Sequence, residues 1–131
     1  MREVFNIGRY FTGDIEGKFW FASQPSSDML EYGHDRSDGH IQAVIYHEEL
    51  KEIKDKVATF KAEFKKNFKM TYKKFMSKMN KKGYMTDSND KETKTKKWGE
   101  MCREASRIEL GDKVITALID KKDDLYVECE C

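Results

Sequence analysis

The chain has 131 residues, and its 25 basic and 24 acidic side chains leave a formal net charge of +1 at pH 7. This length fits a single domain with its own core, and the near-neutral balance excludes a protein that is basic or acidic as a whole. No apolar run approaches the roughly 20 residues that a membrane-spanning helix needs.

Charge is unevenly distributed along the sequence. Residues 1–50 carry four basic and nine acidic side chains, residues 51–97 carry sixteen lysines and six acidic side chains, and residues 98–131 carry five basic and nine acidic side chains. The net charges of these segments are −5, +10 and −4. The positive charge is therefore concentrated in the middle of the chain.

The first predicted element is a β-hairpin. Residues 3–11 and 18–24 have the composition of strands, and Phe19 and Phe21 share one face of the second strand. The polar residues 12–17 form the hairpin connection, in which glycines can adopt positive φ. We expect the aromatic face of this hairpin to seed the core.

Shorter elements follow the hairpin. Pro25 ends the second strand because it has no amide hydrogen for the ladder. Ser26 or Ser27 is the predicted N-cap of a helical turn over residues 28–32. The polar residues 34–40 predict a loop.

A helical period begins at Glu48. Apolar residues recur at steps of three or four as far as Met79. As one helix, residues 48–82 would be about 50 Å long at 1.5 Å per residue, which exceeds the roughly 30 Å diameter of a small domain. We therefore favour a break near residues 67–71, with Thr71 capping the second part. A continuous helix that projects as an arm is the alternative.

A last helical pattern leads to Asp120, with an interruption expected at Gly111 and Asp112. Residues 41–47 and 125–131 alternate in the manner of strands. With the N-terminal hairpin, these strands predict an α+β fold in which a small antiparallel sheet packs on a long helical section.

We expect one domain over residues 1–131, with a lysine-rich helical region at 48–82 and a flexible loop near 83–91. The cysteines at 102, 129 and 131 are odd in number, and no signal-like segment precedes them. This pattern argues for a reducing cytoplasm rather than for a secreted disulfide scaffold.

Three pieces of the sequence together resemble a known group of proteins. They are GRYFTGDIEGKFWFASQPSSD near the start, RIELGDKVITALID late in the chain, and the C-terminal strand with alternate cysteines. Small proteins of tailed bacteriophages, with no established activity, share a GDIEGKFWF-like opening and an RLELG-like segment. The resemblance leaves out the lysine-rich middle. It implies a viral accessory protein that acts in the cytoplasm of a host bacterium.

The hairpin and the late helix predict a small polar cleft for an anionic ligand. An aromatic plane beside an amide and an ammonium can hold a base and a phosphate, and free amides at a helix start suit an anion. The candidate ligand-binding residues are Lys18, Trp20, Gln24, Ser26, Ser27, Arg107 and Glu109. The alternatives are that Trp20 packs into the core and that Arg107 pairs with a carboxylate of the hairpin.

Asp14 and Glu16 are weak catalytic candidates. Two carboxylates at positions i and i+2 of an extended loop could act as an acid and a base or bind a cation. The alternative is that they accept hydrogen bonds from turn amides and keep the loop soluble.

Histidines and cysteines do not predict a metal site. His34, His40 and His47 lack the i, i+4 spacing of zinc enzymes. Cys129 and Cys131 could in principle share a zinc ion with them, and Cys102 could pair with a histidine, but cysteines in apolar stripes are typically buried and inert. We predict no metal and no cofactor.

Lysines along one face of the central helical region form the strongest electrostatic feature. The candidate partner-binding residues are Lys61, Lys65, Lys66, Lys69, Lys73, Lys74 and Lys78. Lysine suits phosphate backbones, while the near absence of arginine argues against base reading. An acidic protein partner and a merely solvated face are the alternatives.

These features favour a non-enzymatic binding protein. In a phage setting it would block or sequester a host component, such as a defence protein or a small anionic signal, without a membrane. The alternatives are a nucleic-acid-binding accessory protein that uses the lysine face and a small hydrolase that uses Asp14 and Glu16. A homodimer would follow if the apolar stripe exceeds what one chain can cover.

Overall fold

The computed structural model describes residues 10–20, 24–35, 41–82 and 95–129. Several predicted features therefore lie outside the described residues, at least in part. They are the start of the first strand, the part of the second strand at 21–23 with Phe21, most of the loop at 34–40, the flexible loop near 83–91 and the end of the last strand at 130–131.

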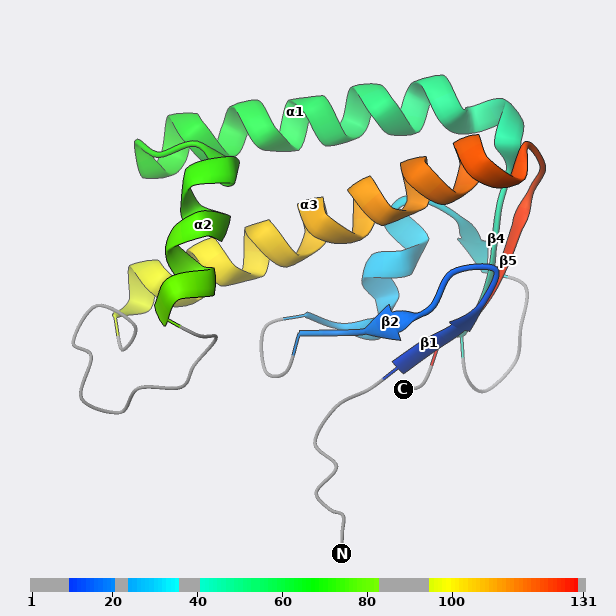
Figure 1. The fold of residues 1–131 in the computed structure, drawn as a ribbon, viewed down its shortest axis with the longest axis horizontal. Helices are drawn as coiled ribbons and strands as arrows, with labels where there is room; N and C mark the ends of the chain where they lie inside the picture. Colours follow the sequence, from blue (N-terminus) through cyan, green and yellow to red (C-terminus); the bar gives the residue numbers. More distant parts are fainter. Residues whose placement is uncertain (1–9, 21–23, 36–40, 83–94, 130–131) are drawn as a thin grey trace, which may run out of the picture.

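Five strands form one antiparallel sheet in the order β2-β1-β5-β4-β3. They are β1 (Tyr10–Gly13), β2 (Gly17–Lys18), β3 (His34–Asp35), β4 (Ile41–Ile45) and β5 (Leu125–Cys129). The C-terminal strand β5 lies in the centre, between β1 and β4 (Figure 1). The predicted α+β fold with an antiparallel sheet is thus confirmed.

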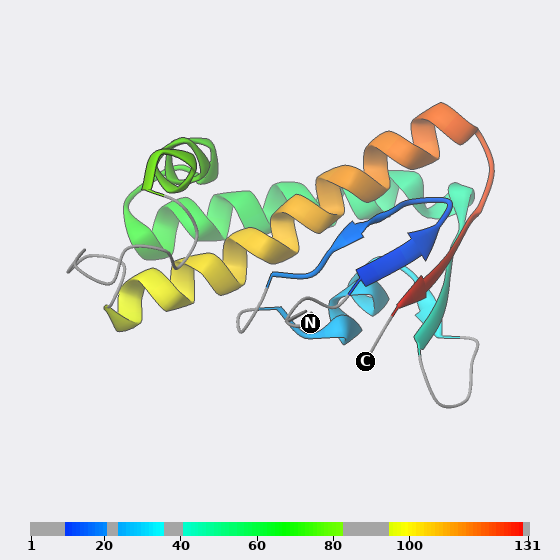
Figure 2. The same ribbon diagram turned by 60° about the horizontal axis from the view of Figure 1, so that its bottom comes forward.

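The helices cover one face of the sheet and extend beyond it (Figures 1 and 2). They are α1 (Leu50–Phe68), α2 (Tyr72–Lys82) and α3 (Lys96–Lys121), with 3-10 turns η1 (Ser26–Glu31) and η2 (His47–Glu49). Side chains in β5 alternate, with Leu125, Val127 and Cys129 buried and the two residues between them exposed. One face of β5 is therefore buried and its other face is exposed, whereas in β4 the consecutive residues Ala43, Val44 and Ile45 are all buried.

The predicted hairpin forms, but its second strand is shorter than expected. β1 pairs with β2 so that Tyr10 lies opposite Lys18, and the rings of Phe11 and Phe19 lie 5.0 Å apart in the core. β2 ends at Lys18 because the chain then leaves the sheet edge: the amide of Gln24 donates to the carbonyl of Trp20.

The turn after this hairpin is capped differently from the prediction. η1 begins at Ser26, with Pro25 at the N-cap position and no side-chain capping hydrogen bond there. The predicted capping role of Ser27 is wrong because this residue lies inside the turn. The predicted strand at 41–47, which is β4, likewise ends at Ile45, because η2 begins at His47.

The central helical region is broken where the sequence favoured a break. α1 ends at Phe68, and the C-cap residue Lys69 adopts a left-handed conformation with φ of 58°. Thr71 then caps α2, because its hydroxyl oxygen accepts a hydrogen bond from the amide of Lys74 at 3.1 Å. The turn folds α2 back so that it crosses the far end of the molecule, from the end of α1 to the start of α3 (Figure 1).

Contacts between aromatic rings join the helices at this end of the molecule. The ring of Phe64 lies 4.9 Å from that of Phe68 and 5.5 Å from that of Phe75, and Phe75 lies 5.0 Å from Trp98 of α3. Phe64, Phe75 and Trp98 are buried. The three helices are therefore joined by one apolar cluster rather than by the turn alone.

The predicted interruption at Gly111 is wrong, because α3 continues through it. A Cβ atom at this position would lie 2.5 Å from Cγ2 of Val57 in α1 and 2.7 Å from the hydroxyl of Tyr32. Gly111 is thus a packing residue. It lets α1 and the end of η1 approach the backbone of α3.

Replacing this glycine should therefore destabilise the fold. In Gly111→Ala the added methyl group must displace a β-branched valine and a hydrogen-bonded tyrosine, so we expect a net loss of about 1–2 kcal/mol. Gly99→Ala is the matched control in the same helix, since no atom lies within 4 Å of its added Cβ. Its better helix propensity should raise stability by about 0.5–1 kcal/mol. Urea denaturation measures both, and equal shifts would contradict the packing role.

Candidate functional site

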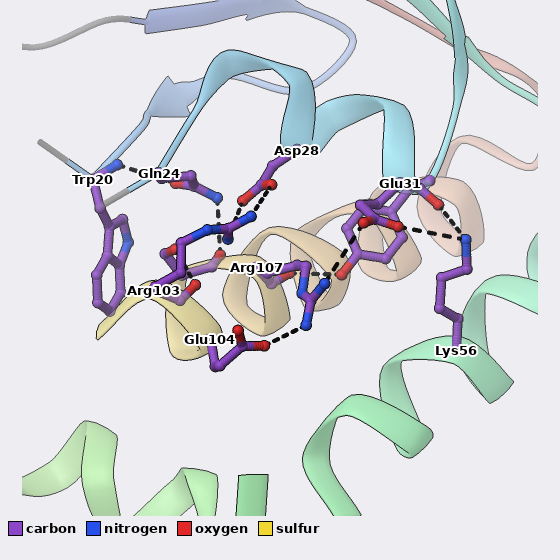
Figure 3. Close-up of polar contacts among 10 residues, drawn as sticks. Trp20, Gln24, Asp28, Glu31, Lys56, Arg103, Glu104 and Arg107 are labelled. Atoms are coloured by element: carbon purple, nitrogen blue, oxygen red, sulfur yellow. Dashed lines mark hydrogen bonds and ion pairs between the residues drawn. The ribbon is translucent and has the colours of Figure 1, made fainter. Parts of the chain in front are cut away.

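The polar edge of α3 meets the chain from Trp20 to Glu31 along a seam, shown in Figure 3. We define this seam by the contacts of Trp20, Gln24, Asp28 and Glu31 with α3. It contains four of the seven residues that the sequence predicted as ligand-binding: Trp20, Gln24, Arg107 and Glu109.

Trp20 and Gln24 are bonded to α3 and to each other. The indole Nε1 of Trp20 donates to a carboxylate oxygen of Glu109 at 3.0 Å. The side-chain amide of Gln24 donates to the carbonyl of Ser106 and accepts from the amide of Trp20, both at 3.0 Å. Gln24 is buried and Trp20 is half-buried against the core. These polar atoms therefore hold the segment to the helix.

A buried ion pair fixes η1 to α3. Both terminal nitrogens of Arg103 donate to the carboxylate of Asp28 at 2.9 Å. The Asp28 side chain is only 3% exposed, whereas that of Arg103 is 35% exposed. Burial raises the pKa of Asp28, and the charge and hydrogen bonds of Arg103 oppose that rise.

Arg107 lies one turn further along α3, between two carboxylates. Its guanidinium carbon lies 4.0 Å from the ring centroid of Phe60. One nitrogen lies 3.6 Å from an oxygen of Glu31, and the other donates to Glu104. Its Nε is buried with no hydrogen-bond partner. The predicted pairing of Arg107 with a hairpin carboxylate is therefore wrong, because η1 and α3 itself supply closer carboxylates.

The same turn of α3 also anchors neighbouring backbone. The hydroxyl of Tyr32 donates to the carbonyl of Arg107 at 2.6 Å. Lys56 of α1 donates to the carbonyl of Glu31 at 2.7 Å and lies 3.8 Å from its carboxylate. Burial raises the pKa of the Tyr32 hydroxyl well above its usual value of 10, so this group stays protonated as a donor.

Lys18 and Ser27, two of the remaining ligand-binding candidates, make none of the contacts that define the seam. Lys18 is exposed on the edge strand β2, with its ammonium 5.9 Å from the ring centroid of Tyr10. Ser27 is exposed within η1, and of Ser26 only the backbone is described. The predicted cleft with a convergent ammonium, indole and amide therefore stays a prediction.

Asp14 and Glu16 have separate surroundings. A carboxylate oxygen of Asp14 accepts from the ammonium of Lys121 at 2.8 Å and from the amide of Tyr126 at 2.7 Å. The hydrogen bond from Lys121 is the main cause that lowers the pKa of Asp14, followed by that from the backbone. Asp14 therefore ties the hairpin loop to the junction of α3 and β5.

Glu16 is exposed and lines an open hollow of about 460 Å³. Three further carboxylates of α3 line it, from Glu109, Asp112 and Asp120. Asp112 accepts from Lys61 at 3.2 Å. The hollow is acidic on balance, which is the opposite of what an anionic ligand requires.

Another hollow, of about 560 Å³, lies on the outward face of the sheet. None of the predicted site residues lines it. Its polar side chains include Gln42, whose amide donates to Glu128 at 3.2 Å.

Histidine and cysteine side chains are dispersed. His34 lies 2.8 Å from Glu49, and the backbone amide of His47 donates to Asp124. Cys102 and Cys129 are buried free thiols, and burial raises the pKa of Cys102 to about 11. No group of three potential metal ligands occurs in the part of the chain that the structure describes. His40 and Cys131 lie outside it.

The end of α1, α2 and the start of α3 form the end of the molecule opposite the sheet (Figure 1), and these segments are rich in lysine. We call this the lysine-rich end. It consists of Lys61, Lys65, Lys66 and Lys69 at the end of α1, Lys73, Lys74 and Lys78 on α2, and Lys96 and Lys97 at the start of α3. Across α1 from Lys61, α2 and the first turns of α3, only Glu63 and Glu100 are acidic.

Seven of these lysines were the predicted partner-binding residues, and they fall into two groups. Lys61 donates to Asp112 and lies 5.6 Å from the ring centroid of Tyr72, and Lys78 is half-buried. The other five are exposed: Lys65, Lys66, Lys69, Lys73 and Lys74. Their ammonium groups form no ion pair or hydrogen bond within the described ranges.

The central ion pair of the seam, between Asp28 and Arg103, was not predicted from the sequence. They are 75 positions apart, and neither residue belongs to a motif. The one available signal was an acidic residue at the start of a predicted turn and an arginine on the apolar side of a helical pattern.

The ion pair predicts an asymmetric response to mutation. In Arg103→Met the Asp28 carboxylate stays buried without its partner, so we expect a loss of about 2–3 kcal/mol at pH 7. Lys97→Met is the control, because it removes an exposed cation from the same helix. The double variant Asp28→Asn, Arg103→Met should recover part of the loss. Urea denaturation at each pH is the measurement.

The loss should depend on pH in a fixed direction. The pKa of Asp28 is higher in the folded protein than in the unfolded one, so the protonated carboxyl favours folding. This stabilising contribution is fully present below the ordinary pKa of 3.8 and is lost as the pH rises through the higher folded pKa. Without Arg103 that pKa rises further, and the loss should be smaller at pH 4 than at pH 7. A loss that is the same at both values would contradict a buried, unpaired carboxylate.

Asp14 should behave as a structural residue. Because the pKa of Asp14 is lower in the folded protein, its ionised carboxylate stabilises the fold at pH values above the ordinary pKa of 3.8. This contribution is lost as the pH falls through the lower folded pKa. Asp14→Asn should therefore lower the thermal midpoint at pH 7 and have less effect near pH 3. Glu16→Gln, the neighbouring exposed carboxylate, should be neutral at both values. Equal effects of the two changes at pH 7 would count against the clamp.

None of the described helices is long and apolar enough to cross a membrane. No protein-family model, curated protein or solved structure matches this chain.

Proposed function

We propose that this chain is a non-enzymatic binding protein whose lysine-rich end engages an anionic macromolecule and blocks or sequesters it. One contrast carries the proposal. The polar groups of the seam are bonded to one another, whereas five exposed lysines at the lysine-rich end have no partner among the described residues. Free charges on a rigid surface are available for a partner, and satisfied buried ones are not.

A macromolecule is favoured over a small anionic signal. The two arginines of the seam are neutralised, Arg103 by Asp28 and Arg107 by Glu31 and Glu104. The hollow lined by Glu109 of the seam has four acidic side chains and one lysine in its lining. A small anion would have to displace these internal contacts, whereas an extended anion can lie across the exposed lysines without disturbing the fold.

A binding role is also favoured over hydrolysis. Asp14 is held by Lys121 and a backbone amide, and its lowered pKa makes it a poor proton donor near pH 7. Cys102 is buried, and its raised pKa disfavours the nucleophilic thiolate.

The resemblance to phage proteins supports a setting for this activity. The chain would act in the cytoplasm of a host bacterium, and its partner would be an acidic component of that host. A defence protein and a nucleic acid both meet this requirement.

The lysine-rich end predicts retention on a polyanion. Wild-type protein should bind immobilised heparin at about 0.15 M salt, where exposed charges more than roughly 8 Å apart are screened and only close contacts persist. The variant in which Lys65, Lys66, Lys73 and Lys74 are replaced by Gln should pass through the column.

A second variant separates local charge from net charge. Replacing Lys51, Lys54, Lys113 and Lys122 by Gln changes the formal net charge from +1 to −3 as well, but these exposed lysines lie outside the lysine-rich end. This control should be retained like the wild type. Failure of the wild type to bind, or loss of binding in both variants, would overturn the proposal.

A further inference from the structure

We infer that the lysine-rich end binds the phosphate backbone of double-stranded nucleic acid, without reading bases and without stacking on them. This inference rests on the proposed function and names the chemical class of its partner. It depends on four properties of the described residues: rigidity, the type of cation, the burial of aromatic rings and the absence of an apolar anchor.

The lysines project from a rigid support. The turn between α1 and α2 carries Lys69, with Lys65 and Lys66 before it and Lys73 and Lys74 after it. Beneath them the aromatic cluster of Phe64, Phe68, Phe75 and Trp98 joins all three helices. The backbone positions of the charges are therefore fixed before a partner arrives, which lowers the entropic cost of binding.

The type of cation points to phosphates. Lysine is a compact point charge on a flexible stem, so it can reach phosphates whose positions vary. Base edges are read chiefly by the planar fork of arginine and by amide side chains. The described arginines, Arg103 and Arg107, lie in the seam and are paired there. Binding through the lysine-rich end should therefore be indifferent to sequence.

Buried aromatic rings favour a duplex over a single strand. Proteins that bind single strands offer exposed rings on which bases stack. Here Phe64, Phe75 and Trp98 are at most 3% exposed, and Phe68 and Tyr72 are half-buried against the same cluster. The surface thus offers charge but no stacking platform, and a duplex presents the higher density of phosphates.

The absence of an apolar anchor argues against an acidic protein. Protein interfaces are enriched in aromatic residues and depleted in lysine, and their binding energy comes mainly from buried anchors. The large hydrophobic side chains that are exposed in the described ranges are Tyr10, Ile119 and Tyr126, on β1, the end of α3 and β5. None of them belongs to the lysine-rich end.

Fluorescence anisotropy with defined duplexes tests the inference. The probes are labelled 20-base-pair DNA duplexes of two unrelated sequences, an RNA duplex, one DNA strand alone and polyglutamate. The two DNA duplexes should bind with affinities within about twofold of each other, and the single strand should bind several-fold more weakly. Binding of the RNA duplex would support the inference equally, and the ratio of the two affinities would identify the preferred source of phosphate.

The salt dependence tests the number of contacts. Five lysine–phosphate contacts should give a slope of about −4 to −5 for log K against log salt, at roughly 0.9 per phosphate. The variant with Gln at 65, 66, 73 and 74 should bind at least tenfold more weakly with a slope near −1. The control variant, with Gln at 51, 54, 113 and 122, should keep the wild-type slope. Circular dichroism and thermal midpoints check that both variants fold.

Several outcomes would overturn the inference. A tenfold preference between the two duplexes would indicate base reading, and tighter binding of the single strand would indicate stacking. Binding of polyglutamate but of no nucleic acid, lost in the four-lysine variant, would remove this inference and leave the proposed function standing. If neither nucleic acid nor heparin is bound, both fail together.

Discussion

The close packing of α3 is the constraint on which the rest of the structure depends. This helix of 26 residues buries one side against α1 and the sheet. Gly111 allows the closest approach, because any larger residue would collide with Val57 and Tyr32. One turn before Gly111, the Tyr32 hydroxyl donates to the carbonyl of Arg107 in α3. One position thus sets the distance between α1, α3 and the turn that ends η1.

The polar edge of the same helix decides where the segment from Trp20 to Glu31 lies. Its contacts include a tryptophan indole, a buried amide and a buried ion pair. Charged pairs of this kind contribute little net stability, since desolvation offsets much of their attraction, but the loss of one partner is costly. We interpret the seam as a device that positions the segment, and for this reason it is a poor candidate for ligand recognition.

The architecture was predictable because its signals are periodic and local. Alternation predicted β4 and β5, the helical stripe predicted α1 and α2, and the length of that stripe required the break that Thr71 caps. Gly111 misled the prediction because its low helix propensity is a local property, whereas its role depends on residues of two other elements.

Site residues were harder to predict, because their roles also depend on contacts between distant segments. Arg107 and Glu109 lie on one helix, as the sequence predicted, but the partners of Arg107 could not be inferred without knowing how η1 lies on α3. The ion pair of Asp28 and Arg103 joins two segments that no local pattern relates. The lysine-rich face needed no such knowledge, because exposed lysines at helical spacing are visible in the sequence itself.

The course of α3 separates opposite charges along the molecule. It starts at Lys96 and Lys97 and ends about 40 Å away at 1.5 Å per residue, where Asp120, Asp123 and Asp124 outnumber Lys121 and Lys122. In the field of a charged rod, such a molecule experiences a torque that turns its positive pole forward before contact. The protein therefore samples fewer unproductive orientations before it binds. The resulting gain in association rate should decrease as added salt shortens the Debye length.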